Sequence, residues 1–168
     1  IAKTANENTR FVIFPNASRA SEEGTHNNDI VAIREFRSYA KERFDADAFE
    51  RIAWVDYDIN NASVRRITAA ADLLVTSRFH AMISGLVCTT PTLVIGWSHK
   101  YLETLAGFEM ESAAFNYNAE PEVIINAAQK MLSHLLEIKA QIAKHLPENQ
   151  RSSSAQFDCL KEVLAWKN

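Results

Sequence analysis

Two side chains that can bind an anion and supply a proton lie two residues apart near the middle of the sequence. Arg78 carries a planar, permanently charged guanidinium that suits a phosphate or a carboxylate, and His80 carries the side chain that titrates nearest to neutral pH. They follow Ser77 at the end of the apolar run 73–75. The pattern predicts an anion site with a proton donor. The alternative is that Arg78 pairs with a nearby acid to close the strand end, while His80 only packs beside the sheet.

A strand that runs directly into a helix must position these residues. Residues 73–75 are apolar without alternation, which is typical of a parallel strand covered on both faces. We expect Ser77 to cap the following helix, so that Arg78 is its first residue and His80 its third. The first turn of a helix has backbone N–H groups without intrahelical partners and favours a phosphate or a carboxylate. The junction therefore adds backbone donors to the two side chains.

The composition indicates one globular domain. The 168 residues are 47% hydrophobic and 23% charged, which is enough to bury a full core. The net charge of −3 gives no general reason to expect nucleic acid as a partner. No apolar run approaches the roughly 20 residues that span a bilayer, and no signal-peptide pattern is present, so we expect a cytoplasmic protein without a transmembrane segment. Cys88 and Cys159 lack metal-ligand spacing, and we expect neither a metal nor a cofactor.

Strand and helix patterns alternate along almost the whole sequence, which predicts an α/β fold with a Rossmann-like open, mostly parallel sheet and helices on both faces. Strands are expected at residues 11–14, 51–55, 73–76 and 91–97, with a small fifth strand at 113–115. Helices are expected at residues 28–44, 63–70 with Ser63 as the cap, 78–88, 98–106, 121–145 and 157–166, with a break at 148–154.

The same patterns predict how the chain is divided. Residues 1–10 form a polar leader, residues 11–147 a Rossmann-like donor-binding domain, and residues 148–168 a terminal helix. Because the sequence begins at Ile1 rather than at a methionine, we expect it to be a domain of a longer protein.

Ligands of a doubly wound sheet bind at the carboxyl ends of its strands, so the loops at that edge are the candidate sites. The loop after residues 11–14 brings Asn28 and Asp29 to this edge, although either residue can instead cap the next helix. The loop after residues 91–97 brings Ser98 and Lys100, and Lys100 is either a phosphate contact or an ordinary surface lysine. The acidic and amide residues at 56–61 predict a solvated turn rather than a metal site.

This region resembles the polysaccharide pyruvyl transferase family. Residues 77–81 (Ser-Arg-Phe-His-Ala) resemble the strand-to-helix junction of that family, and residues 90–95 with Lys100 resemble its following proline-initiated strand. Phe14-Pro15 and the Asn-Asn-Asp run at 27–29 are similar to its preceding βα unit. The close resemblance covers residues 72–100, and a looser one covers most of residues 11–117.

The resemblance implies a two-domain, GT-B-like fold, in which two Rossmann-like halves face each other across a cleft. This chain would be the C-terminal, donor-binding half. Its terminal helix would dock on the missing N-terminal domain, which would hold much of the acceptor, a sugar or lipid-linked glycan of a surface polysaccharide. The implied reaction transfers an enolpyruvyl unit from phosphoenolpyruvate to two hydroxyls of the acceptor, forms a pyruvate ketal and requires no metal.

Such a reaction needs an acid and several anion contacts. His80 would protonate the methylene carbon of the donor, and Arg78 would hold the donor carboxylate or phosphate. Backbone N–H groups near Phe79 and His80 would bind the same anion, and Lys100 would contact the phosphate. The remaining candidate contacts are Ser77, Ser98, Asn28 and Asp29.

Two functions of other classes stay open. The first is the nucleotide-sugar-binding half of a glycosyltransferase, which would use the same strand-end geometry for a diphosphate. It usually needs an acidic residue for the ribose, and Glu103 and Glu109 are candidates at unconvincing positions. The second is a non-catalytic Rossmann-like module for interaction or assembly, in which Arg78 and His80 would tolerate alanine.

Overall fold

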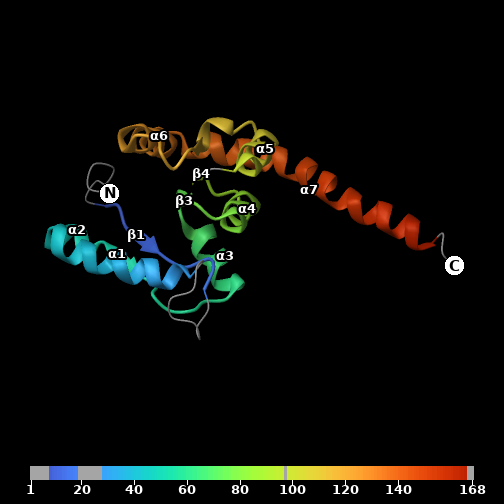
Figure 1. Ribbon diagram of the computed structural model, residues 1–168. Helices are drawn as coiled ribbons and strands as arrows, with labels where there is room; N and C mark the ends of the chain where they lie inside the picture. The colour runs from blue at the N-terminus through green and yellow to red at the C-terminus, as the bar shows by residue number, and fades with distance from the viewer. Residues whose placement is uncertain (1–7, 19–27, 97, 166–168) are drawn as a thin grey trace.

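Short apolar segments form parallel strands in two separate sheets (Figure 1). The structure is a computed structural model that describes residues 8–18, 28–96 and 98–165. Strand β1 (Phe11–Ile13) pairs with β2 (Ile52–Trp54), and β4 (Thr92–Ile95) pairs with β3 (Leu74–Thr76) on one side and β5 (Ala114–Phe115) on the other. The parallel α/β class is confirmed, but the described strands form two sheets where the sequence predicts one.

Helices connect these strands, mostly within a few residues of the expected bounds. They are α1 (Asp29–Arg43), α2 (Ala46–Glu50), α3 (Asn61–Ala70), α4 (Phe79–Val87), α5 (His99–Ala106), a 3-10 turn (Glu111–Ala113), α6 (Pro121–Ser133) and α7 (Leu135–Ala165). The short helix α2 was not expected from the sequence. Residues 1–7 of the polar leader, together with Asn27, Trp97 and Trp166, lie outside the described residues.

Side-chain caps set where several helices begin. The Asn28 side chain accepts from the backbone N–H of Ile30 at 3.2 Å and caps α1. Helix α3 begins two residues earlier than expected, because Asn60 rather than Ser63 is its cap and accepts from the Ser63 N–H at 2.9 Å. The interpretation of Asn28 as a cap is therefore confirmed, and the assignment of Ser63 is wrong.

The C-terminal part of the chain differs most from expectation. The helix that starts at Pro121 ends at Ser133, with His134 as its C-cap (φ −124°, ψ 29°), and α7 then runs without a break through residues 148–154. Pro147 removes one helical hydrogen bond, but the carbonyl left without its donor belongs to exposed Ala143, where water can bind it. The Asn149 amide also donates to the carbonyls of His145 at 3.0 Å and Gly107 at 2.6 Å, which holds this turn.

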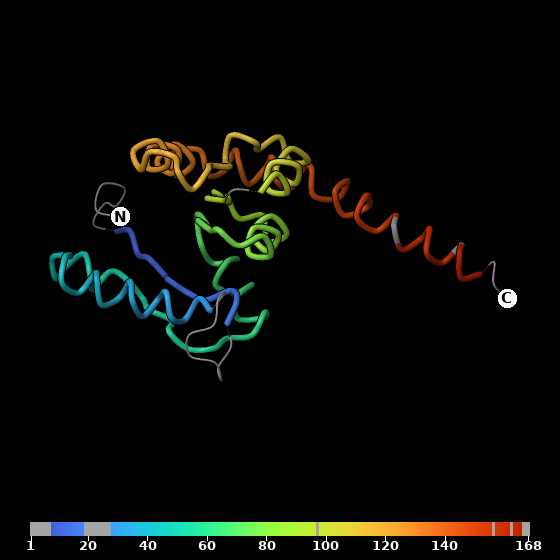
Figure 2. Tube along the Cα trace, in the orientation of Figure 1, coloured from blue at the N-terminus to red at the C-terminus, as the bar shows by residue number. Residues whose placement is uncertain are grey.

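The main core surrounds β4 and includes only the first part of α7. Leu93 of β4, Met82 of α4, Leu105 of α5 and Ile142 of α7 are fully buried together. After Asn149 the helix leaves the body of the protein, as the trace shows (Figure 2). Nowhere in the described ranges is a helix both long and apolar enough to cross a membrane.

Candidate anion-binding site

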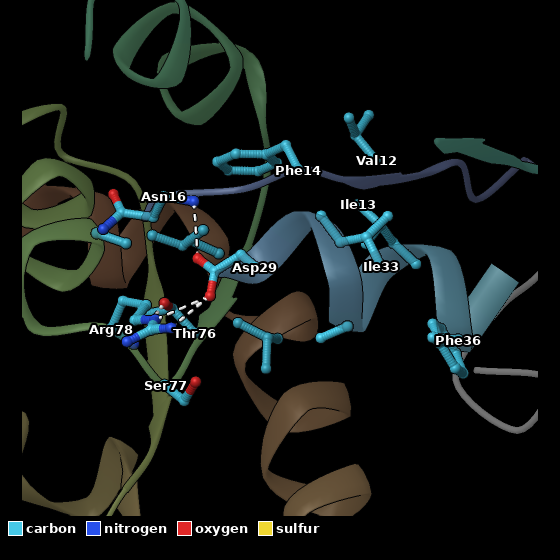
Figure 3. A pocket seen from close by; sticks show the side chains of 14 residues that line it. Val12, Ile13, Phe14, Asn16, Asp29, Ile33, Phe36, Thr76, Ser77 and Arg78 are labelled. Atoms are coloured by element: carbon cyan, nitrogen blue, oxygen red, sulfur yellow. Dashed lines mark hydrogen bonds and ion pairs between the residues drawn. The ribbon is translucent and has the colours of Figure 1, made fainter. Parts of the chain in front are cut away.

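The carboxylate of Asp29 joins the two sheets at the carboxyl ends of β1 and β3 (Figure 3). Its Oδ1 accepts from Arg78 Nε at 3.1 Å and Nη2 at 2.5 Å. Its Oδ2 accepts from the backbone N–H groups of Asn16 at 3.0 Å and Ala17 at 2.9 Å. One side chain thus receives donors from the junction that follows each strand. It fixes Arg78 relative to the loop after β1.

The ion pair of Arg78 with an acid is therefore confirmed. The two side chains keep 32% (Arg78) and 20% (Asp29) of their surface exposed, so the pair lies at the edge of the solvent. A guanidinium carries five N–H donors in a planar fork, and the carboxylate of Asp29 orients that fork. An arginine held in this way is suited to bind an incoming phosphate or carboxylate without losing much side-chain freedom.

The start of α4 lies one residue later than expected. Arg78, not Ser77, is the N-cap, so His80 is the second residue of the helix. The Thr76 hydroxyl accepts from the Arg78 N–H at 3.0 Å, and the Tyr101 hydroxyl donates to the Ser77 carbonyl at 2.8 Å. Both bonds hold the chain extended at this point. Among the described residues no side chain caps α4, so its first-turn N–H groups remain suited to an anion.

His80 lies on the exposed side of the same turn. Its ring meets the Phe79 ring edge-on at 5.9 Å, and the Phe79 ring lies 6.1 Å from that of Tyr101. The cavity beside the ion pair is lined by Ser77 and Arg78, and its lining within the described part of the chain does not include His80. The structure thus brings Ser77, Arg78 and Asp29 together and leaves the His80 side chain open to solvent.

The second helix N-terminus at this edge belongs to α5. The Ser98 hydroxyl accepts from the Lys100 N–H at 3.4 Å and caps the helix. Lys100 is exposed in the first turn. Because the Tyr101 hydroxyl bonds the Ser77 carbonyl, the start of α5 is fixed to the start of α4. The starts of both helices thus lie at the carboxyl edge of β3 and β4.

Sequence reasoning missed Tyr101 and Gly96. A Cβ atom at Gly96 would collide with the Tyr101 ring, so the close approach of strand end and ring requires glycine. A glycine directly after a strand is a recognisable signal of such an approach. These two residues fix the start of α5 against the end of β3.

A cavity of about 350 Å³ separates β1 from β3 beneath the ion pair. Its polar end is formed by Asn16, Asp29, Thr76, Ser77 and Arg78. The rest is largely apolar and comes from β1, α1, β3 and α4, with Val12, Ile13, Phe14, Ala32, Ile33, Phe36, Leu74, Val75 and Ala81 in its wall.

Carboxylates elsewhere at this edge are bound to neighbouring side chains. Asp56 pairs with Arg37 at 2.8 Å, and Asp58 accepts from the Ser18 hydroxyl. In the part of the chain that the structure describes, no group of three His, Cys, Asp or Glu side chains is placed to hold a metal ion.

Parallel strands whose carboxyl edge carries an oriented arginine and two helix N-termini define an α/β protein with a candidate anion site at that edge. The chain belongs to the polysaccharide pyruvyl transferase family, because the sequence model of that family matches residues 6–99, more than half of the 168 residues. This confirms the resemblance seen in the sequence. The match lies in the N-terminal part of the chain, contains Arg78, His80 and Ser98, and ends just before Lys100. No curated protein and no solved structure matches the sequence.

Proposed function

We propose that this chain binds phosphoenolpyruvate as the donor of a pyruvyl transfer to a polysaccharide. The observation that carries the proposal is the oriented guanidinium of Arg78 at the N-terminus of α4, which no described side chain caps, inside the segment that the family model matches. Anions are stabilised at such a helix start, and the Arg78 guanidinium adds a positive charge that Asp29 holds in place.

The donor has two anionic groups, and the edge offers two places for them. One group would bind Arg78 and the backbone N–H groups of Phe79 and His80. The other would approach the start of α5, where exposed Lys100 supplies a second positive charge. Because the Tyr101 hydroxyl donates to the Ser77 carbonyl, the starts of α4 and α5, where the two groups would bind, are fixed relative to each other. Ser77 and Ser98 would supply further hydrogen bonds, while Asp29 would orient Arg78 rather than touch the donor.

His80 would act as the general acid. Its proton would pass to the methylene carbon of the donor, which becomes a methyl group, while positive charge develops on the adjacent carbon. One acceptor hydroxyl would add to that carbon and return a proton to His80. The bond to phosphate would then break, and a second hydroxyl would add to the same carbon and give its proton to the released phosphate, which closes the ketal. The exposure of His80 suits this role, because both donor and acceptor must reach it from solvent.

The chain would form the C-terminal half of a two-domain, GT-B-like protein that works in the cytoplasm. The exposed part of α7 supports a docking role. Phe157, Leu160 and Leu164 recur at helical spacing and are 58%, 53% and 57% exposed. We propose that this face packs on the N-terminal domain, which would hold the sugar or glycan acceptor.

Calorimetric titration tests the donor assignment. Phosphoenolpyruvate should bind the family protein that contains this chain, and Arg78→Ala should weaken binding at least tenfold, about 1.4 kcal/mol. Arg66→Ala, on the exposed side of α3, removes the same charge elsewhere and should leave binding unchanged. His80→Ala should slow transfer far more than it weakens donor binding.

Other outcomes would assign a different function. Selective binding of a uridine or guanosine diphosphate sugar would make the chain the nucleotide-sugar half of a glycosyltransferase. If no ligand binds and Arg78→Ala changes nothing, the module has an interaction role, and the proposal is wrong.

A further inference from the structure

The two sheets present unpaired strand edges to each other. Strands β1 and β3 both line the cavity, but within the described residues they belong to separate sheets and share no ladder of hydrogen bonds. Val12 in the middle of β1 and Val75 in the middle of β3 are 47% and 50% exposed. Half-exposed valines are unusual inside a parallel sheet, which is normally covered on both faces.

The hydrogen bonds to the outer strands show which backbone groups face the gap. The Phe11 N–H donates to the Arg51 carbonyl and the Ile13 carbonyl accepts from Val55 N–H, both at 2.9 Å, so these residues bond toward β2. Backbone groups alternate in direction along a strand, so those of Val12 point away from β2.

The same alternation applies to β3. The Leu74 N–H donates to the Pro91 carbonyl at 2.8 Å, on the side of β4, so the backbone groups of Val75 point away from β4. Among the described residues the backbone groups of Val12 and Val75 have no hydrogen-bond partner, and they lie on the two edges that border the cavity. Both edges are open templates for a further strand.

The order of the strands indicates what belongs there. Strand β2 follows β1 in the sequence and lies on the side of β1 away from the cavity. Strands β4 and β5 follow β3 and lie on the opposite side, also away from the cavity. Two doubly wound orders have this reversal. In the order 2-1-3-4-5, β1 and β3 would pair directly with each other. In the order 3-2-1-4-5-6, the first strand of the sheet lies between the strands that correspond to β1 and β3. The unpaired edges of β1 and β3, with a cavity between them, fit this second order.

We propose that a β-strand of the same polypeptide, located before Ile1 in the full-length protein, fills the gap parallel to β1 and β3 and completes one continuous sheet. A strand in this place would connect to β1 by a right-handed crossover, in the same direction across the sheet as the connection from β1 to β2. A segment after α7 is a poorer source, because α7 leads away from both sheets (Figure 1). The apolar wall of the cavity suits a buried, apolar strand.

This strand would also extend the anion-binding site. Its carboxyl end would emerge beside Asp29 and Arg78, where the polar end of the cavity lies. The residues that follow it would then contribute to the crevice at the point where the strand order reverses. The proposal concerns the sheet itself and does not rest on the identity of the donor.

Amide hydrogen exchange in the full-length protein tests it, with no ligand present. The amides of Val12 and Val75 should exchange about 100-fold more slowly than in the 168-residue chain, because both become hydrogen-bonded inside the sheet. Couplings across those hydrogen bonds should identify acceptor carbonyls in residues before Ile1. The Leu74 amide, already bonded to the Pro91 carbonyl, is the matched control and should be protected in both.

A second comparison needs only the full-length protein. Val75→Pro removes the N–H that would bond the inserted strand and should lower the melting temperature, whereas Val75→Thr should not. The proposal is wrong if both amides stay unprotected there, if β1 and β3 bond each other directly, or if Val75→Pro is tolerated.

Discussion

Replacing Asp29 should lower the stability of the protein more than replacing its partner Arg78. Arg78→Ala removes one partner, but leaves Asp29 with the backbone N–H donors of Asn16 and Ala17. Asp29→Ala removes the pair and also leaves both of those N–H groups without their acceptor. The carboxylate mutant should therefore lose more free energy of unfolding than the guanidinium mutant.

The sizes follow from the exposure of the two side chains. At 20% and 32% exposed, the pair lies between a surface ion pair and a buried one, so it contributes about 1–2 kcal/mol. Each backbone N–H that is left without an acceptor adds about 1 kcal/mol to the loss of stability. Arg78→Ala should thus cost about 1–2 kcal/mol and Asp29→Ala about 3–4 kcal/mol. For a chain of this length these losses correspond to melting temperatures lower by roughly 5 °C and 10 °C.

Thermal and urea unfolding followed by circular dichroism measure both values. Asp29→Asn should fall between them, because its amide keeps one acceptor oxygen. Asp72→Ala serves as the control, since its carboxylate is 75% exposed and lies 3.9 Å from Lys139, and it should change stability by less than about 0.5 kcal/mol. Equal losses for Asp29→Ala and Arg78→Ala would refute the contribution of the two backbone bonds.

Three further changes test other parts of the structure. Gly85→Ala should cost about 2 kcal/mol in urea unfolding, because the new Cβ would collide with the Thr92 hydroxyl; a neutral result would mean that α4 packs less closely. Tyr101→Phe should cost about 1 kcal/mol through loss of the bond to the Ser77 carbonyl, and an unchanged urea midpoint would contradict that bond. Leu160→Ser should alter the unfolding of this chain by less than about 0.5 kcal/mol, and a larger loss would show that α7 is already covered.

Local patterns in the sequence were enough to predict the strands and most helices. Apolar runs with turn residues between them mark β1 to β5 to within two residues at each end. The errors came where two local signals compete. The polar residues 148–154 predict a break, but α7 continues through them. The exposed Pro147 is accommodated because the carbonyl it leaves unbonded faces water, and Asn149 supplies tertiary support.

The site depended more on contacts between distant residues. Arg78 was predicted as an anion contact from its place after a strand, and the same reasoning named a nearby acid as the alternative partner. Which acid it is follows only from the fold, because Asp29 lies 49 residues away. The Tyr101 bond that displaces the start of α4 by one residue is likewise non-local, since 24 residues separate it from Ser77. No helix propensity encodes either contact.

The long helix α7 consists of two parts with different physical support. Up to Asn149 it is anchored by the buried Ile142 side chain and by the amide bond to the Gly107 carbonyl. Beyond Arg151 every described side chain is exposed, so this part depends on its own helix propensity, and an isolated helix of about 12–15 residues is only marginally stable in water. A surface that covers Phe157, Leu160 and Leu164 would therefore fold this segment as well as bind it. The strength of docking would then respond to substitutions that change helix propensity alone, even at positions that touch no partner.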